Sequence, residues 1–281
     1  MLYFVRSICS ALLIIFLCGC TLPVHQYMYD GEARKYLLYA PENLPDGAPL
    51  VFMLHGYHGK ASLYSRFTAF NRVADEMGFA VCYPQGLKDE EGVSHWNARL
   101  DISEVDDIGF LSELAQHLQA KHGFDKDKTF TSGISNGGFM SYTLACEAPE
   151  IFSGAASIIG TMSGKSWDDC QTKGVPILQI SGVEDKVVPI DGTMSEDGGW
   201  GGAPHMDKVI AFWASTNGCQ SSTSSTIASK TTALYYSDCE QNNKVWYYKV
   251  SDLGHNLPSQ KNSGFRAEEV VGAFFMGISK D

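Results

Sequence analysis

The sequence predicts an α/β fold in which helices cover both faces of one mostly parallel sheet. Two observations support this prediction. Short segments that are apolar at nearly every position indicate strands buried on both faces, as in a covered parallel sheet. These segments alternate with others whose apolar residues recur at helical spacing. With 281 residues, of which 44% are hydrophobic and 19% charged, the chain has ample apolar material for a large core.

The expected elements follow one another along the chain in alternation. The first strands are expected at residues 33–41, 48–56 and 78–86, with a helix at 64–79 before the third. A helix at 106–122 follows, with acidic residues in its first turn. The later order is strand 128–133, helix 137–148, strands 154–160 and 175–181, helix 205–218 and strand 244–250. The Ser/Thr-rich tract at 221–225 is expected to be a surface loop.

Residues 1–20 are expected to be an export signal, followed by a single domain at 21–281. Arg6 precedes an apolar run at 11–17 that is too short to span a bilayer. The end of this segment, Leu17-Cys18-Gly19-Cys20, resembles the bacterial lipoprotein box, which would make Cys20 the lipidated residue. The alternative is an ordinary cleaved signal peptide with a coincidental cysteine. Either interpretation predicts an exported protein, secreted or held at the periplasmic or cell surface as a lipoprotein.

The cysteines beyond this segment fit an oxidising compartment. Four of them can form two disulfides, and sequence proximity favours the pairs Cys146–Cys170 and Cys219–Cys239, although the sequence does not fix the pairing. Cys82 lies in an apolar run and is expected to be a buried free thiol. A metal site is disfavoured because no C-x-x-C pair is present. The net charge of −11 argues against a nucleic-acid partner.

The pentapeptide Gly133-Ile134-Ser135-Asn136-Gly137 matches G-x-S-x-G, a motif that places a serine nucleophile on a sharp strand-to-helix turn. The alternative is a serine in a glycine-rich loop. A predicted strand directly before the motif and a predicted helix directly after it supply the context that the turn requires. The pattern therefore favours Ser135 as a nucleophile.

A serine hydroxyl needs a base, and the base needs an orienting acid. In this architecture the acid and then the histidine follow the nucleophile in the chain. Asp185 lies just beyond the strand at 175–181, with Glu184 and Asp191 as lesser candidates. Of the later histidines, His205 lies at a helix start, whereas His255 lies in a loop after the strand at 244–250. The sequence therefore predicts Asp185 as the acid and His255 as the base.

An oxyanion hole is expected from two backbone N–H groups. The N–H of Asn136, directly after the nucleophile, is one. The N–H of Tyr57 is the other, because Gly56 lets the loop after an early strand approach the site closely. His55 and His58 flank this loop, and structural roles are expected for them in preference to metal binding.

With these residues assembled, the chain resembles the secreted esterase family of polyhydroxybutyrate depolymerases, the feruloyl and acetylxylan esterases of carbohydrate esterase family 1, and LpqC-like lipoproteins. The matching stretches run in family order from about residue 33 to 277: HGYHG, CYPQG, HWNA, EVDDIGFL, SGISNGGFMSYTLACEAPEIF, SGVEDKVVPI, FWASTNGC and LGHNLP. The resemblance implies an α/β-hydrolase fold, a Ser-Asp-His triad and ester hydrolysis without a cofactor. It also implies disulfide support near the histidine loop, with which Cys219 and Cys239 are consistent.

The function expected from this resemblance is that of an exported serine esterase. Its substrates would be feruloyl or acetyl esters of plant polysaccharide, or short 3-hydroxyalkanoate esters, as small molecules or on a polymer. Trp200 is a candidate for stacking on substrate at the cleft rim, and Trp96 is a candidate for the cleft wall or the core. The alternatives are an acyltransferase acting on a sugar acceptor and a non-catalytic carbohydrate-binding protein. The protein would contact the membrane only through a lipid at its N-terminus.

Overall fold

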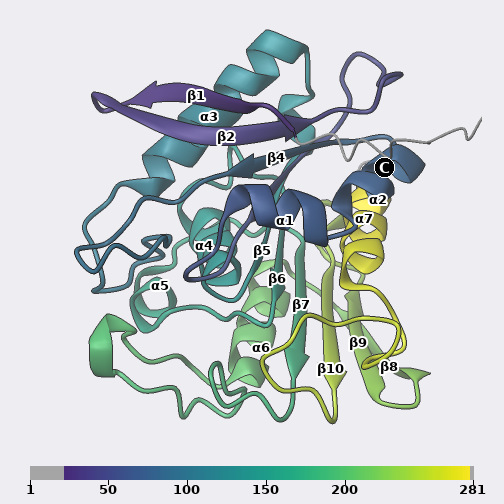
Figure 1. Ribbon diagram of the computed structural model, residues 1–281. Coiled ribbons are helices and arrows are strands. Elements are labelled where there is room, and N and C mark those ends of the chain that lie inside the picture. The colour runs from purple at the N-terminus through teal and green to yellow at the C-terminus, as the bar shows by residue number, and fades with distance from the viewer. Residues whose placement is uncertain (1–21, 279–281) are drawn as a thin grey trace, which may run out of the picture.

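Ten strands form one sheet in the computed structural model, which describes residues 22–278 (Figure 1). In chain order the strands are β1 Val24–Tyr29, β2 Glu32–Tyr39, β3 Leu50–Leu54, β4 Ala80–Pro84, β5 Thr129–Ile134, β6 Ala155–Ile158, β7 Ile177–Gly182, β8 Ser221–Ala228, β9 Thr231–Ser237 and β10 Val245–Val250. Their order in the sheet is β1-β2-β4-β3-β5-β6-β7-β10-β9-β8. The central strands from β4 to β10 are parallel, and antiparallel hairpins extend both ends. The predicted mostly parallel sheet is confirmed.

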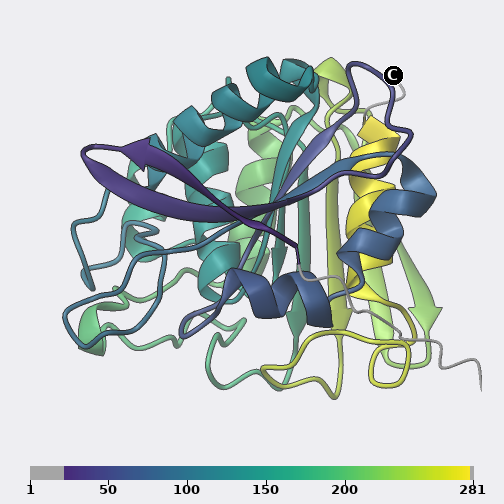
Figure 2. The same cartoon turned by 45° about the horizontal axis from the view of Figure 1, so that its top comes forward.

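Helices pack on both faces of this sheet, as predicted (Figures 1 and 2). One face is covered by α1 Ala61–Phe67, α2 Phe70–Met77 and α7 Ala267–Ile278. The other face is covered by α3 Asp107–His122, α4 Asn136–Glu147, α5 Gly164–Asp169 and α6 Met206–Thr216. Short 3₁₀ turns lie at η1 Lys126–Lys128, η2 Asp197–Gly199 and η3 Glu240–Asn242. In the region from 22 to 278, no helix is long and apolar enough to cross a membrane.

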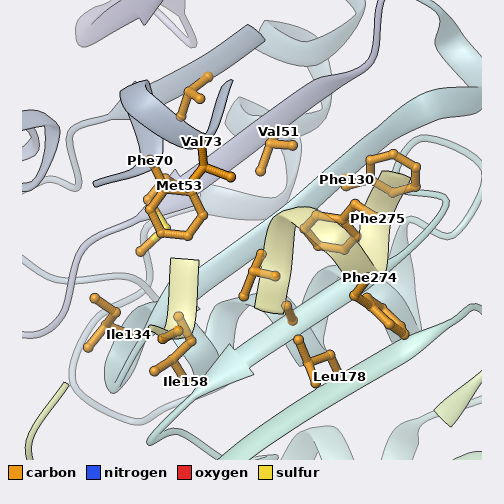
Figure 3. Packing of buried hydrophobic residues seen from close by; sticks show 14 of the residues in the cluster. Val51, Met53, Phe70, Val73, Phe130, Ile134, Ile158, Leu178, Phe274 and Phe275 are labelled. Carbon is orange, nitrogen blue, oxygen red and sulfur yellow. The ribbon is translucent and has the colours of Figure 1, made fainter. Parts of the chain in front are cut away.

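The core between the sheet and α7 is built from interlocking aromatic and branched side chains (Figure 3). Phe130 of β5 stacks on Phe275 of α7, with ring centroids 4.6 Å apart. Val51 of β3 and Val73 of α2 are fully buried in the same cluster. Burying each such side chain stabilises the fold by about 2 kcal/mol. This packing fixes the strands whose carboxyl ends hold the site described below.

The single helix expected at 64–79 is two helices. Thr68 adopts an extended conformation after α1, and its Oγ1 donates to the Tyr64 carbonyl at 2.6 Å. The N–H of Ala69 then donates to Glu268 of α7 at 3.2 Å, at the start of α2. The apolar spacing across this break includes Phe67, which is 79% exposed on α1, whereas Phe70, Val73 and Ala74 of α2 are buried.

The polar tract expected to be a loop is part of the edge strand β8. It pairs with β9 from Ser221↔Ser237 onward, and its residues are exposed on both sides. A strand with no buried face has no apolar alternation, so its sequence resembles that of a loop.

Both favoured disulfides are present, Cys146–Cys170 and Cys219–Cys239, and Cys82 is a buried free thiol. The expected position of the second disulfide is wrong. Cys239 follows β9 and lies near the amino end of β10, since Tyr236 pairs with Val245, whereas the histidine loop follows the carboxyl end of β10. The bridge is therefore at the opposite edge of the sheet from that loop. Cys20 and the expected signal lie outside the described residues.

Candidate active site

Ser135 occupies the sharp turn between β5 and α4. Its backbone has φ 55° and ψ −120°, a conformation that a residue with a side chain rarely adopts. Backbone hydrogen bonds hold it there: its N–H donates to Ile158 of β6 at 2.9 Å, and its carbonyl accepts from Gly138 at 2.7 Å. The neighbouring strand and the first turn of α4 thus stabilise this strained conformation. The conformation projects the Ser135 side chain away from the sheet.

Two glycines of the motif are required by close backbone approach. A Cβ on Gly133 would lie 2.1 Å from the carbonyl carbon of Gly137, and a Cβ on Gly137 would lie 2.4 Å from the carbonyl oxygen of Leu54. Both distances are far below van der Waals contact with backbone atoms that cannot move aside. These glycines therefore allow β5, α4 and β3 to meet beneath Ser135.

Asp185, His255 and Ser135 form one hydrogen-bonded chain. The distance from His255 Nε2 to Ser135 Oγ is 2.9 Å, and the distance from His255 Nδ1 to Asp185 Oδ2 is 2.7 Å. The Asp185 side chain is only 1% exposed, and its other oxygen accepts from the N–H groups of Val187 and Val188 at 2.8 and 2.9 Å. The carboxylate is held by fixed donors, so it fixes the orientation of the imidazole in turn.

The loops that carry Asp185 and His255 are joined to each other. Val183 donates its N–H to Val250 at 2.9 Å, and Glu184 donates its N–H to Leu253 at 3.0 Å. Both loops start at the carboxyl ends of adjacent parallel strands, β7 and β10. Ligand-facing groups of parallel sheets gather at that edge.

The other sequence candidates for acid and base lie in local structures of their own. The Asp191 carboxylate accepts from the N–H and hydroxyl of Thr193. His205 caps α6, since its Nδ1 accepts from the N–H of Asp207 at 3.1 Å. Glu184 takes part in the loop contact above through its backbone.

The two predicted oxyanion donors are the N–H groups of Tyr57 and Asn136. In the part of the chain that the structure describes, neither N–H has a hydrogen-bond acceptor. The carbonyl of Gly56 is held by the N–H of Gly59 at 2.9 Å and by the His55 ring at 2.8 Å. Because the peptide bond is planar and trans, the N–H of Tyr57 must point the opposite way, away from the His55 ring.

His55 is the buried support of this loop. Its Nε2 accepts from the N–H of Gly86 at 3.0 Å and lies 3.0 Å from the Gln85 amide nitrogen, so the ring proton is on Nδ1 and donates to Gly56. Burial lowers the pKa of His55 to about 4, which keeps the ring neutral at physiological pH. The structural role expected for His55 is therefore a specific one: it fixes the direction of the Gly56–Tyr57 peptide.

Trp96 is not positioned to touch substrate, contrary to one of the two roles considered for it. Its side chain is fully buried, and its Nε1 donates to the carbonyl of His55 at 2.9 Å. Its backbone forms a reciprocal pair with the Asn136 amide: the N–H of Trp96 donates to Oδ1 at 2.7 Å, and Nδ2 donates to the Trp96 carbonyl at 3.0 Å. The pattern G-x-S-x-G leaves the residue after serine unspecified, so this role of the Asn136 side chain was not predicted.

Two cavities meet at Ser135. The first, of about 470 Å³, is lined by Tyr57, Ser135, Lys186, Val187, Val188, Pro189, Thr193, Met194, Ser195 and Trp200. The second, of about 510 Å³, is lined by Gly56, Tyr57, Leu63, Tyr64, Phe67, Thr68, Ile134, Ser135, Ile159, His255, Asn256 and Leu257. Trp200, the other tryptophan considered, lies in the wall of the first cavity with its ring 5.3 Å from that of Tyr57.

The parallel sheet, the strained serine after β5 and the acid and histidine after β7 and β10 define the class of protein: an α/β-hydrolase. The chain belongs to the esterase PHB depolymerase family, whose family model matches residues 34–230. This membership agrees with the resemblance stated from the sequence.

Individual relatives are similar over parts of their length. The putative esterase NocK of Nocardia uniformis subsp. tsuyamanensis is 31% identical over 175 residues, which cover 61% of this chain and 51% of the relative. Feruloyl esterase B of Piromyces equi is 24% identical, covering 79% of this chain and 42% of the relative. The chain thus spans about half the length of the first relative and less of the second.

Solved structures show the same fold at low sequence identity. The acetyl xylan esterase from Aspergillus awamori superposes with a TM-score of 0.63 at 16% identity, over 91% of this chain and 99% of that one. The Bacillus cereus carboxylesterase gives a TM-score of 0.59 at 13% identity, over 87% and 94%. The α/β-hydrolase fold is therefore shared well beyond the similarity in sequence.

Proposed function

We propose that this protein is a serine esterase that hydrolyses carboxylic esters through an acyl-enzyme. The observation that supports the proposal most strongly is the hydrogen-bonded chain from Asp185 through His255 to Ser135. Ser135 lies on a strained turn and lines two cavities. A serine held in this way is a nucleophile whose proton has an acceptor within hydrogen-bond distance.

In the proposed reaction, Ser135 Oγ attacks the ester carbonyl carbon while His255 Nε2 takes its proton. The negative charge on the carbonyl oxygen is stabilised by the N–H groups of Tyr57 and Asn136. As the intermediate collapses, His255 gives the proton to the leaving alcohol and an acyl-serine remains. Water, activated by the same histidine, then releases the acid and regenerates the serine. Asp185 orients the imidazole and stabilises its positive charge throughout.

The substrate range is proposed from the named relatives and the cavities together. Relatives include feruloyl esterases, an acetylxylan esterase/xylanase and a poly(3-hydroxyalkanoate) depolymerase. We propose that the acyl group is feruloyl, acetyl or 3-hydroxyalkanoyl, because the cavity beside Trp200 combines an aromatic wall with the hydroxyls of Thr193 and Ser195.

The test is a panel of esters spanning these acyl groups: methyl ferulate, p-nitrophenyl acetate and methyl 3-hydroxybutyrate. Acid release is measured for the wild type, for Ser135→Ala and for Ser225→Ala, a matched change of an exposed serine on β8. We expect Ser225→Ala to match the wild type and Ser135→Ala to lose activity by about 10⁴-fold or more. Equal turnover by Ser135→Ala and the wild type would refute the proposal.

We also propose that the protein is exported and that Cys20 is its lipid attachment site. The disulfides Cys146–Cys170 and Cys219–Cys239 support export, since such bonds persist in oxidising compartments. Expression with radiolabelled palmitate tests the anchor. Label is expected in the wild type and lost in Cys20→Ser, whereas label in both would show that Cys20 is not the site.

A further inference from the structure

We propose that the cavity beside His255 binds the alcohol part of the ester. We further propose that Phe67 and Leu63 give this cavity a preference for an apolar alcohol over a sugar. The inference rests on the proposed esterase activity and assigns the two sides of its site. It follows from the position of His255, from the side chains of α1 and from the polar groups available in this cavity.

The direction of the ester follows from the proton transfer. The leaving oxygen must take its proton from His255 Nε2, so the alcohol has to lie on the side of that imidazole. His255 lines the second cavity and not the first. The acyl substituent of the tetrahedral carbon points away from the leaving oxygen, so we assign it to the first cavity, which shares Tyr57 and Ser135 with the second cavity but is not lined by His255. The geometry thus separates an alcohol cavity beside His255 from an acyl cavity beside Trp200.

The rim of the alcohol cavity carries apolar side chains that the fold leaves uncovered. The Phe67 residue is 79% exposed and Leu63 is 43% exposed. They lie four residues apart on α1 and therefore on the same side of that helix. An aromatic side chain this exposed gains nothing from the core. Its position at the mouth of a cavity that reaches Ser135 indicates contact with a ligand.

Two polar groups of the alcohol cavity already have partners. The Thr68 hydroxyl donates to the Tyr64 carbonyl at 2.6 Å, and the Tyr64 hydroxyl accepts from the N–H of Gly56 at 2.9 Å, which leaves its one proton to donate. Asn256 adds one exposed amide at the rim. A sugar that binds here gives up the hydrogen bonds of several hydroxyls to water, and the cavity offers few groups to replace them. Each hydroxyl left unpaired costs binding free energy. An alkyl or aryl alcohol loses no such bonds and gains from covering Phe67.

The experiment varies the alcohol at constant acyl group. We would measure kcat/KM for methyl, butyl and hexyl acetate by acid release in a pH-stat, for the wild type, Phe67→Ser and Leu63→Ser. The matched control is Met28→Ser, a change of a residue on β1 that is 62% exposed. The quantity kcat/KM includes the acylation step, so it responds to the alcohol even where deacylation limits kcat.

We expect the wild-type kcat/KM to rise about tenfold or more from methyl to hexyl acetate, since each buried methylene adds to binding. Phe67→Ser should lose most of this rise while methyl acetate changes less than about twofold. Met28→Ser should retain the whole rise. In a second series, from methyl acetate to methyl hexanoate, the alcohol is constant and the acyl group is lengthened. Over this series the change in kcat/KM should be the same in Phe67→Ser and the wild type. Thermal unfolding of each variant checks that these exposed substitutions leave the fold intact.

The outcomes separate the inference from the activity on which it rests. A wild type that hydrolyses no ester would overturn the proposed function and the inference together. A wild type that hydrolyses methyl acetate, with the full rise retained in Phe67→Ser, would overturn the inference alone. So would an effect of Phe67→Ser on the acyl series in place of the alcohol series, or faster hydrolysis of acetylated xylo-oligosaccharide than of hexyl acetate by the wild type.

Discussion

The hydrogen-bonded side chains at and beneath the candidate active site and the side chains around its cleft differ in how firmly the fold holds them. We call the first group the floor: Ser135, Asp185, His255, His55, Trp96 and Asn136. We call the second group the rim: Leu63, Phe67, Val187 and Trp200. Each residue of the floor has at least one hydrogen bond to another loop or strand. The side chains of the rim residues pack against neighbouring rings or protrude into solvent.

This difference separates two properties of the site. The floor fixes atoms to which a reaction is sensitive: the direction of an N–H group, the tautomer of an imidazole and the position of a carboxylate. The rim sets how much apolar surface a substrate can cover. Changes to the floor should therefore alter rate or stability for every ester, whereas changes to the rim should alter the ranking of esters.

The largest effect is expected from Asp185→Asn. The amide cannot stabilise the imidazolium and favours the wrong tautomer of His255, so kcat should fall by about 10⁴-fold while the fold persists. Steady-state kinetics on p-nitrophenyl acetate measures this. The matched control, Asp191→Asn, changes an exposed carboxylate in the same segment and should stay within about twofold of the wild type. A comparable loss in both variants would contradict the assignment of Asp185.

The next effect concerns His55 and pH. Its pKa in the folded protein is about 4, whereas the unfolded chain should protonate near pH 6.5. Between these values the unfolded state binds the proton and the folded state does not, so stability falls as the pH drops from 6.5 to 4. Over that window the loss due to His55 should reach about 3 kcal/mol.

Urea unfolding at several pH values tests this in the wild type and His55→Gln. The glutamine does not titrate, so the stability difference between the two proteins should shrink as the pH falls through this window. A difference that is independent of pH would show that His55 is not buried in its neutral form.

A smaller effect is expected from Asn136→Ala. The change leaves the buried N–H of Trp96 without its acceptor, which should lower the free energy of unfolding by about 2 kcal/mol. Urea unfolding at neutral pH measures this value. Asn256→Ala, an exposed amide at the cleft, should change it by less than about 0.5 kcal/mol. If the two variants were equally stable, the pairing of Asn136 with Trp96 would not be part of the floor.

The smallest effect is expected from the rim residue Trp200. Trp200→Ala should lower kcat/KM for methyl ferulate by about tenfold and leave methyl acetate within about twofold, because only a large acyl group can contact the ring. The same substrates tested on Phe67→Ser give the matched control on the other cavity. A uniform loss on both esters would place Trp200 with the floor.

The floor was more accessible to sequence reasoning than the rim. The fold class is confirmed, because apolar runs and helical spacing report burial directly. The sequence also brought Ser135, Asp185 and His255 together as candidates, since the chain order of nucleophile, acid and base is tied to the strand order of the sheet. The structure places these three within hydrogen-bond distance.

What the sequence did not predict depends on contacts between distant segments. The break between α1 and α2 involves Glu268, 199 positions from Ala69. The edge strand β8 is defined by pairing with β9 and has no buried face to mark it. Trp96 and Trp200 are the same residue type, so their roles depend on their tertiary neighbours. Trp96 is a buried support of the His55 loop, and Trp200 lies in a cavity wall.

The central claim, that the floor makes Ser135 a nucleophile, is tested most directly by covalent labelling. Diethyl p-nitrophenyl phosphate is incubated with the wild type, Ser135→Ala and His255→Ala, and each protein is measured by intact mass and peptide mapping. We predict one diethylphosphoryl group on Ser135 in the wild type, none in Ser135→Ala and strongly slowed labelling in His255→Ala. Labelling at another residue, or equal rates in the wild type and His255→Ala, would contradict the claim.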